Sequence, residues 1–550
     1  MPDHQDIYGN KVDTSSMLSL FKKAVWPPDF QIPPWGDRKS IFDHIAAHIE
    51  PERAQGLSEE GYRLPDEPEA DSSSISFAPG AMDGAFGHHG STKSDDEIVR
   101  SIHAALVSAC QNASDRNVRS LYKLILDSSA LAVIDPLIER ILEEQALDAD
   151  RLREIVVWFA TKAPDREPVK FSMALLGLLR GNDDSDIFLT LGRHDEFTLY
   201  SAVALSNSDV YGDEALWKLA IAAEGWGRIS TVERLADTNS AEIKDWLLRD
   251  GFKNSVMYEY LACICARAGD LHLALKRQED DPELFNSAVE LIDTLVSGEG
   301  GPAEGLSDYE HGCAAIQMLL RKGDGKWSSA SHFWFLWKLK ERIAEHLSGE
   351  RVLEQDWTEQ DSQVIAEKIE ALLSTSEWKD VLLEALQNGD RQSFWDASRS
   401  CEKLGIDPWK YFLDRTKAGE DYWWDLMRTS DASRIDNVLA LAAEKIPLEE
   451  ISTGPGNDLG LGIEYASHSA LDFILQDLGN FPGKGWDFVK AGLRSPVIRN
   501  RNMAIRALSD WGQDNWPDEA TECVKSAIIE ETEEDVQKRL ENALAGRELN

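Results

Sequence analysis

Three titratable side chains follow one another at intervals of four residues near the C-terminus: Glu464, His468 and Asp472. On an α-helix this spacing places them within about 80° of one another on one face. Two carboxylates flanking an imidazole can transfer protons or coordinate a metal ion. Asn457 and Asp458 precede this segment, and they extend the patch because loops before a helix N-terminus accumulate binding groups. The sequence therefore predicts a candidate polar patch made of these five residues.

The orientation of the patch depends on the helix that carries it. We expect a helix from Ile463 to Leu478 whose core face consists of Ile463, Ala466, Ala470, Phe473 and Ile474. His468 would then lie about 200° from Ala466 and be directed away from the core. Two interpretations remain open. Either the patch binds a ligand or partner, or His468 pairs with Glu464 or Asp472 in solvent, as charges four residues apart commonly do.

Other histidines offer weaker spacing for chemistry. His44 and His48 are four residues apart on a short helix expected over Ser40 to Ile49, His88–His89 lies near Asp83, and His194–Asp195 opens a loop or helix. A metal site needs three or four converging ligands. No G-x-S-x-G, H-E-x-x-H or C-x-x-C pattern occurs. The sequence therefore indicates no catalytic residue and no set of metal ligands.

Two glycine-rich segments, residues 298–305 and 454–462, raise the question of a nucleotide site. A dinucleotide fingerprint requires a strand before the loop, whereas each of these segments follows a predicted helix. Each also carries acidic residues where a pyrophosphate would lie, and no P-loop pattern is present. We interpret both segments as helix caps and turns, and the sequence indicates no bound cofactor.

Composition opposes several classes of function. The chain has 550 residues, with 57 Lys and Arg against 98 Asp and Glu, and a formal net charge of −41. Such a charge opposes binding to nucleic-acid phosphates and to anionic membranes. The sequence shows no apolar run typical of a transmembrane helix and no apolar signal-peptide segment at its start. With six cysteines and no C-x-x-C pair, we expect reduced thiols and a cytoplasmic protein.

The elements that would position these residues are helices. From Asp96 onward, apolar residues recur with helical spacing, as in Met257, Leu261, Ile264, Cys265 and Ala268. Asp281 followed by Pro282 predicts a helix start, with the aspartate as N-cap. A largely apolar pattern repeats at an offset of 36 residues, because Met503, Ala504, Ala507 and Leu508 match Arg539, Leu540, Ala543 and Leu544. This offset is near the length of a two-helix HEAT unit, of order 40 residues. The predicted fold class is all-α, a HEAT-like α-solenoid of stacked helix pairs. A non-repetitive helical bundle is the alternative.

We divide the chain into four segments. Residues 1–95 form an irregular, partly disordered N-terminal arm, parts of which dock through Trp26, Phe30, Trp35, Phe77 and Phe86. Residues 96–300 and 301–450 form an N-terminal and a Trp-rich middle block of helical repeats, and residues 451–550 form C-terminal HEAT-like repeats. The two glycine-rich segments mark joints. The 18 tryptophans fill gaps between stacked helices, or some of them line a groove for a peptide or apolar ligand.

Four segments carry a resemblance to a known family: residues 255–262 (SVMYEYLA), 301–304 (GPAE), 453–455 (TGP) with 459–462 (LGLG), and 495–504 (SPVIRNRNMA). Together they resemble a bacterial family that carries the name limonene hydroxylase, and the resemblance extends from about Leu199 to the C-terminus. The family name implies a monooxygenase, which would need haem, flavin or non-haem iron. None of the four segments brings a catalytic motif that can be assigned to residues of this chain.

Two functions follow as hypotheses. Helical-repeat arrays present long surfaces to other proteins, and an acidic array favours basic or neutral protein segments over nucleic acid. We therefore expect a cytoplasmic scaffold or adaptor that binds a protein partner through a concave acidic surface, without nucleic acid or membrane. The alternative is the monooxygenase that the family resemblance implies.

Overall fold

The computed structural model describes residues 32–50, 56–67, 80, 96–179, 184–207, 212–277, 279–353 and 357–549. These residues form 28 α-helices and no strand, with two isolated β-bridges. The predicted all-α fold is confirmed for this part of the chain. The arrangement of the helices as HEAT-like repeats stays a prediction.

Helix boundaries follow local capping signals. The predicted N-cap at Asp281 is confirmed, since its carboxylate accepts a hydrogen bond from the Leu284 amide and Pro282 begins the helix. Such a side chain satisfies one of the amide groups that a helix N-terminus leaves unpaired. Ser114 and Asp148 cap two further helices in the same way.

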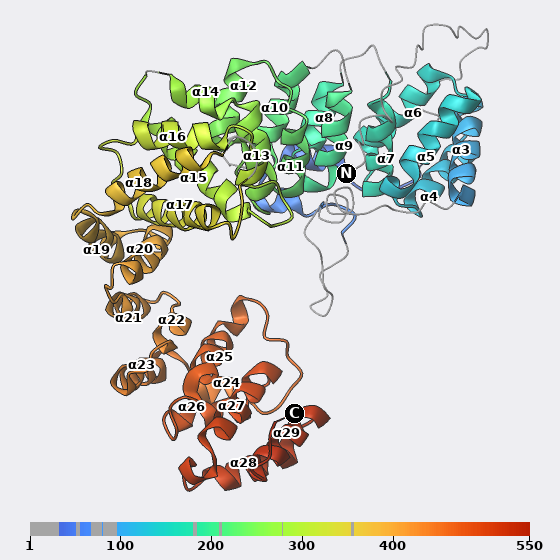
Figure 1. Ribbon diagram of the computed structural model, residues 1–550. Coiled ribbons are helices and arrows are strands. Elements are labelled where there is room, and N and C mark those ends of the chain that lie inside the picture. The colour runs from blue at the N-terminus through green and yellow to red at the C-terminus, as the bar shows by residue number, and fades with distance from the viewer. Residues whose placement is uncertain are drawn as a thin grey trace. The chain divides into compact units, whose positions relative to one another are not determined.

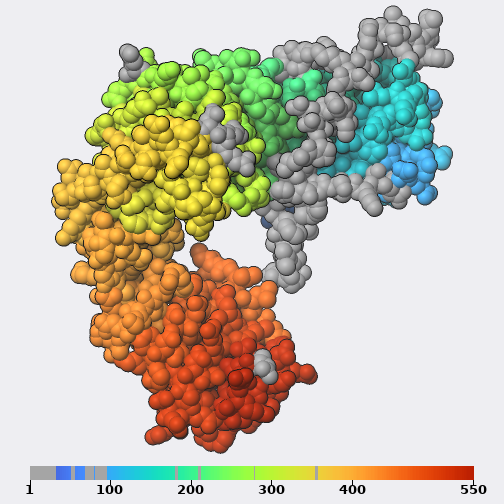
Figure 2. Space-filling view, in the orientation of Figure 1, coloured from blue at the N-terminus to red at the C-terminus, as the bar shows by residue number. Residues whose placement is uncertain are grey.

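The chain divides into two compact units, which we describe separately (Figures 1 and 2). Unit 1 comprises residues 1–327 and 335–374, and unit 2 comprises residues 328–334 and 375–550, so that α17 (Ala330–Ser348) contributes to both. The predicted boundaries near residues 300 and 450 stay predictions.

Unit 1 contains most of the helices. They are α1 (Ile41–Ala47), α3 (Asp96–Gln111), α4 (Asp115–Leu126), α5 (Ala130–Glu144), α6 (Ala149–Lys162), α7 (Arg166–Leu176), α8 (Ser185–Leu191), α9 (Asp195–Ser206), α10 (Gly212–Ala222), α11 (Gly225–Glu233), α12 (Ala241–Trp246), α13 (Glu259–Ala268), α14 (Leu271–Lys276), α15 (Pro282–Gly298), α16 (Gly312–Lys322) and α18 (Glu359–Leu373), with the short turns η2 (Glu59–Tyr62), η3 (Leu247–Gly251) and η4 (Leu306–Asp308). The turn η3 is a π-helix. Helices α3, α5, α7, α9, α11, α13 and α15 contact one another in this order, as they would in a stack of helix pairs.

The described part of the N-terminal arm docks on unit 1. Helix α1 packs against α6 and α8, and its Ile41 and Ile45 side chains are fully buried. Trp35 is 8% exposed, and Arg38 forms an ion pair with Asp165 at 2.6 Å. The predicted docking is therefore confirmed at Trp35. The other four aromatic residues of the arm that we named lie outside the described residues.

Unit 2 carries the candidate site. Its helices are α19 (Trp378–Asn388), α20 (Arg391–Lys403), α21 (Trp409–Lys417), α22 (Trp423–Met427), α23 (Ala432–Lys445), α24 (Leu448–Ile451), α25 (Ala466–Leu478), α26 (Trp486–Leu493), α27 (Ile498–Trp511), α28 (Ala520–Glu530) and α29 (Glu534–Leu544), with the 3-10 turns η5 (Ile463–Tyr465) and η6 (Gln513–Asn515). Helix α27 lies at the centre of its C-terminal part, where it contacts α25, α26 and α29 (Figure 1).

Two further sequence expectations concern cysteines and membranes. The six cysteines form no disulfide, and all except the half-buried Cys523 are buried. In the described ranges, no helix is both long and apolar enough to cross a membrane.

Candidate functional site

A long loop connects α24 to the η5 turn, and we call it the 452–463 loop. Its backbone is fixed to the turn before α27, because the Gly454 amide donates to the Arg494 carbonyl at 2.8 Å and the Asp458 amide donates to the Pro496 carbonyl at 3.3 Å. Asp458 and Val497 also form an isolated parallel bridge. The first half of the loop is therefore attached to residues 494–497 at Gly454 and Asp458.

Three large apolar side chains of this loop lie in solvent. Leu459 is 70% exposed, Leu461 is 67% exposed and Ile463 is 93% exposed. Gly460 lies between the two leucines with a φ of +69°, and a Cβ there would lie 2.7 Å from Val497 Cγ1. Only glycine tolerates both this φ and this close approach. The glycine side of the loop thus faces α27, and the two leucines flank the point of contact.

The sequence that contains the loop is acidic. Residues 446–483 contain no Lys or Arg and carry six acidic residues: Glu449, Glu450, Asp458, Glu464, Asp472 and Asp477. Isolated exposed apolar residues are ordinary on protein surfaces, whereas clustered ones rimmed by polar groups mark interaction sites. Arg494 and Arg499, in and beside the segment that anchors the loop, are exposed as well, so the loop combines exposed apolar side chains with charged neighbours of both signs.

Beneath the loop lies a buried polar network centred on Asn500, which is 0% exposed. Its Nδ2 donates to the His468 carbonyl at 2.9 Å and to Asp472 Oδ1 at 2.5 Å. Its Oδ1 lies 3.0 Å from His468 Nδ1 and accepts the Ser495 hydroxyl at 2.7 Å. Because Asn500 Oδ1 can only accept, His468 Nδ1 carries the proton. Each of these polar groups gains a partner that compensates for its burial.

Asp472 connects the network to the surface. Its carboxylate accepts hydrogen bonds from Asn500 and from the Arg499 guanidinium. Burial raises the pKa of Asp472, while Arg499 and Asn500 oppose this shift. The side chain of Asp472 is 8% exposed, whereas that of Arg499 is 48% exposed. The pair therefore lies at the edge of the network.

A buried ion pair between Arg501 and Glu531 connects the segments around this network. The side chains of Arg501 and Glu531 are each 1% exposed. Arg501 Nε and Nη2 donate to the two Glu531 oxygens at 2.8 and 3.2 Å, and Arg501 Nη1 donates to the Ser495 and Pro496 carbonyls at 2.8 and 3.1 Å. This bidentate ion pair connects α27, the turn that anchors the loop, and the junction between α28 and α29.

The predicted orientation of the polar patch is wrong. His468 and Asp472 are buried at 8% and 6% exposure, whereas Ile463, expected in the core, is almost fully exposed. The helix begins at Ala466, and Ile463 belongs to the η5 turn. Leu471, Ile474, Leu475 and Leu478 form the core side instead, which rotates His468 inward. Glu464 and Asn457 remain exposed and Asp458 is half-buried, so that the patch divides into a loop part and a buried part.

The buried part has the composition of a catalytic dyad but not its geometry. His468 Nδ1 lies 3.1 Å from Ser495 Oγ. However, Ser495 is 0% exposed, and its hydroxyl donates to Asn500 and accepts from the Val497 amide. A nucleophile must instead face a substrate and donate to its base. Across the described residues, no group of three or more His, Cys, Asp or Glu side chains could hold a metal ion.

The other candidate histidines have structural contacts. The rings of His44 and His48 contact each other at a tilt, with centroids 4.5 Å apart, and His48 Nδ1 lies 2.8 Å from the His44 carbonyl. His194 is buried and caps α9, accepting from the Glu196 amide, and burial lowers its pKa to about 4. His88, His89 and Asp83 lie outside the described residues.

Asp195, at the start of α9, should make the stability of unit 1 depend on pH. Burial, with smaller repulsion from Glu224 and Glu196, raises the pKa of Asp195 to about 7. The folded chain therefore binds a proton that the unfolded chain has lost, and stability falls as the pH rises from about 4 to about 7. We expect Asp195→Asn to remove this decline and to stabilise unit 1 by about 1–2 kcal/mol at pH 8. Urea unfolding at several pH values measures it.

Asp186→Asn is the control for this experiment, because Asp186 is an exposed carboxylate on the neighbouring helix α8. It should leave the pH dependence of the wild type unchanged. If Asp195→Asn and the wild type lose stability in parallel between pH 4 and pH 7, Asp195 is not the responsible group.

The comparisons with known proteins add little. No family model matches the chain, and no curated protein matches it significantly. One solved structure, an engineered protein, shares 16% sequence identity with a TM-score of 0.19, over 81% of this chain and 98% of that one. A TM-score this low carries no structural argument.

Proposed function

We propose that this chain is a cytoplasmic adaptor that binds a protein partner through the 452–463 loop of unit 2. The observation that supports this proposal is the exposure of Leu459, Leu461 and Ile463, at 67–93%, on a backbone that is anchored to the turn before α27. Burial of one large aliphatic side chain contributes about 1.5–3 kcal/mol. Three such side chains on a pre-organised loop are sufficient for a specific contact, because little conformational entropy is lost on binding.

The charge around the loop selects the kind of partner. The chain carries a net charge of −41, and residues 446–483 contain six acidic residues and no Lys or Arg, so the acidic side of the loop attracts basic partner segments. The partner segment that fits carries apolar residues flanked by Lys or Arg, such as an amphipathic basic helix. The earlier expectation of a concave acidic binding surface stays a prediction.

Replacing the three apolar residues tests this proposal. We expect the full-length variant Leu459→Ser/Leu461→Ser/Ile463→Ser to bind the partner at least about tenfold more weakly, because the apolar contact is lost. Its free energy of unfolding should stay within about 0.5 kcal/mol of the wild type, since the side chains are exposed. Affinity capture from the source cell, followed by titration of each recovered protein, measures the first effect, and urea unfolding measures the second.

Ile529→Ser is the matched control, because Ile529 is 84% exposed on α28 of the same unit. A protein retained by the wild type and by the control but lost by the triple variant supports the proposal. Equal retention by all three contradicts it. Absorption spectra and iron analysis of the same preparations test the monooxygenase alternative, because a stoichiometric haem, flavin or iron centre would support the chemistry that the family resemblance implies.

A further inference from the structure

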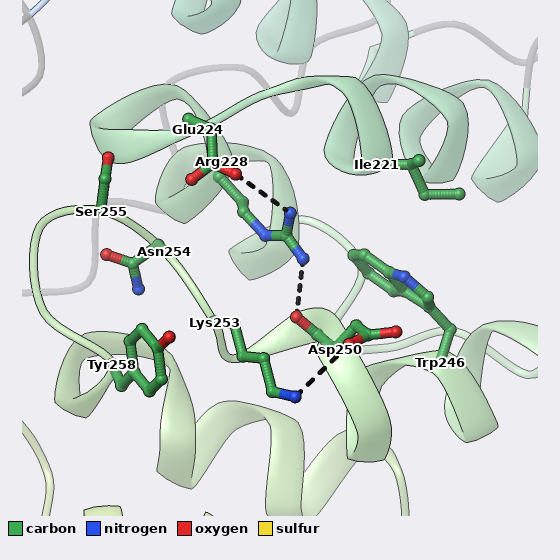
Figure 3. A pocket seen from close by; sticks show the side chains of 9 residues that line it. All are labelled: Ile221, Glu224, Arg228, Trp246, Asp250, Lys253, Asn254, Ser255 and Tyr258. Atoms are coloured by element: carbon green, nitrogen blue, oxygen red, sulfur yellow. Dashed lines mark hydrogen bonds and ion pairs between the residues drawn. The ribbon is translucent and has the colours of Figure 1, made fainter. Parts of the chain in front are cut away.

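Unit 1 contains a hollow of about 580 Å³ between α10, α11, α12, the η3 turn and the loop before α13 (Figure 3). Its lining residues are Ile221, Glu224, Arg228, Trp246, Asp250, Lys253, Asn254, Ser255 and Tyr258. This volume is in the range of pockets that bind small molecules. The hollow lies wholly within unit 1 and is independent of the loop proposed above.

Arg228 is a buried cation with few partners. It is 7% exposed, and Nη2 donates to the Asp250 carbonyl at 2.6 Å. Nε is buried without a hydrogen-bond partner, and the nearest carboxylate, Glu224, is 4.0 Å from Nη1. The guanidinium lies over the Trp246 ring at 5.3 Å. Because burial disfavours its charge, it lowers the pKa of Arg228. An acceptor from a ligand would compensate for this burial.

Two carboxylates of the hollow have unused acceptor capacity. No described donor lies within hydrogen-bonding distance of the Glu224 carboxylate, whose side chain is 23% exposed. The Asp250 carboxylate is 59% exposed and contacts Lys253 at 3.5 Å. Lys253 is instead closer to Glu290, at 3.1 Å. The hollow thus contains a guanidinium and two carboxylates that have few hydrogen-bond partners. Its two cationic and two anionic lining residues give no net charge.

Hydrogen bonds close the turn that forms one wall of the hollow. Asn254 is 8% exposed, and its amide closes the 252–257 turn by donating to the Phe252 and Met257 carbonyls and accepting from the Val256 and Met257 amides. The η3 turn beside it is a π-helix, a conformation often found at functional sites. Figure 3 shows Arg228 between Glu224 and the η3 turn, with Trp246 and Tyr258 on opposite sides. A pre-formed wall limits the entropy lost on binding.

We propose that this hollow binds a small zwitterion of the α-amino-acid class. The ligand's carboxylate accepts from Arg228 Nη1, its ammonium donates to Glu224, and its side chain lies against Ile221 and Trp246. A ligand with only a carboxylate would meet the repulsion of Glu224 and Asp250. A ligand with only an ammonium would leave Arg228 uncompensated. A zwitterion supplies an acceptor for Arg228 and a donor for Glu224 at the same time.

Ligand-observed NMR saturation transfer on the full-length chain tests the proposal. The common free amino acids are screened first, and then the strongest binder is compared with its N-acetyl derivative and its amide, which carry only the carboxylate or only the ammonium. We expect each derivative to bind at least about tenfold more weakly than the free amino acid. Glu224→Gln and Arg228→Lys should each weaken binding of the free amino acid by a similar factor. Glu224→Gln removes the negative charge that pairs with the ammonium, and Arg228→Lys removes the planar guanidinium that pairs with the carboxylate.

Arg267→Lys is the control, since Arg267 borders a separate hollow and pairs with Glu304 and Glu310. It should leave binding unchanged. If Arg228→Lys does not fold, as thermal melting would show, Glu224→Gln remains the deciding variant, because the Glu224 side chain is more exposed than that of Arg228. Absence of saturation transfer from every amino acid overturns the proposal. So does equal binding by either derivative, or binding that Glu224→Gln leaves unchanged.

Discussion

Arg501→Met is expected to lower the free energy of unfolding of unit 2 by about 3–5 kcal/mol. The substitution removes the charge that pairs with Glu531, and both side chains are 1% exposed. Glu531 would then remain as a buried carboxylate whose other donors are the Thr532 and Glu533 amides. The Ser495 carbonyl would lose the Arg501 donor as well, and the Pro496 carbonyl would keep only the Asp458 amide. Urea unfolding followed by far-UV circular dichroism measures the effect, with the two units allowed separate transitions.

Arg506→Met on the same helix is the control, because the Arg506 side chain is 58% exposed and lies 3.8 Å from Asp510. It should cost less than about 1 kcal/mol. The double variant Arg501→Met/Glu531→Gln should recover part of the loss, since removing both charges is less costly than isolating one. Equal unfolding midpoints for Arg501→Met and Arg506→Met would show that the buried pair does not stabilise unit 2.

Asn500→Ala is expected to cost about 2–4 kcal/mol, because one amide satisfies four buried groups. They are the His468 carbonyl, His468 Nδ1, the Ser495 hydroxyl and Asp472 Oδ1. The anchor of the 452–463 loop should loosen too, since Ser495 begins the turn to which the loop is bound. We therefore expect faster amide hydrogen exchange at Gly454 and Asp458. Thermal melting and hydrogen-exchange mass spectrometry measure the two effects.

Asn502→Ala provides the comparison on the same helix, because the Asn502 side-chain oxygen is buried without a hydrogen-bond partner. Its removal should cost less than about 1 kcal/mol and leave exchange in the loop unchanged. If the Asn500→Ala protein has the same melting temperature as the Asn502→Ala protein and keeps slow amide exchange at Gly454, the network does not have the structural role proposed for it.

Local signals in the sequence were sufficient to predict the helices. Asp281 and Pro282 mark the start of α15 because capping depends on neighbouring residues alone. The helix expected over Ser40 to Ile49 is α1 (Ile41–Ala47), so the prediction lies within two residues of the structure at each end. Apolar periodicity reports such elements reliably because one face of each helix must be buried.

The site was predicted only in part, because its burial depends on distant residues. Asn500 and Ser495 contact His468 from 32 and 27 positions along the chain, and no local pattern contains that information. Ile463 was assigned to the core because it is apolar, yet it precedes the helix in a 3-10 turn. Leu459 and Leu461 were not singled out because the segment 454–462 was interpreted only as a cap and turn. Their flanking glycines, at positions 460 and 462, were the signal that the segment turns outward.

Site-specific photo-crosslinking tests the central claim most directly. A photoreactive phenylalanine analogue would replace Leu461 in the full-length chain, and Ile529 in a control chain, because both positions are largely exposed in the same unit. We predict that irradiation in the source cell yields a discrete crosslinked protein from position 461 that is absent from position 529, and that a peptide with apolar and basic residues carries the crosslink. No discrete adduct at position 461, or the same adducts at both positions, would contradict the claim that the 452–463 loop is a protein-binding surface.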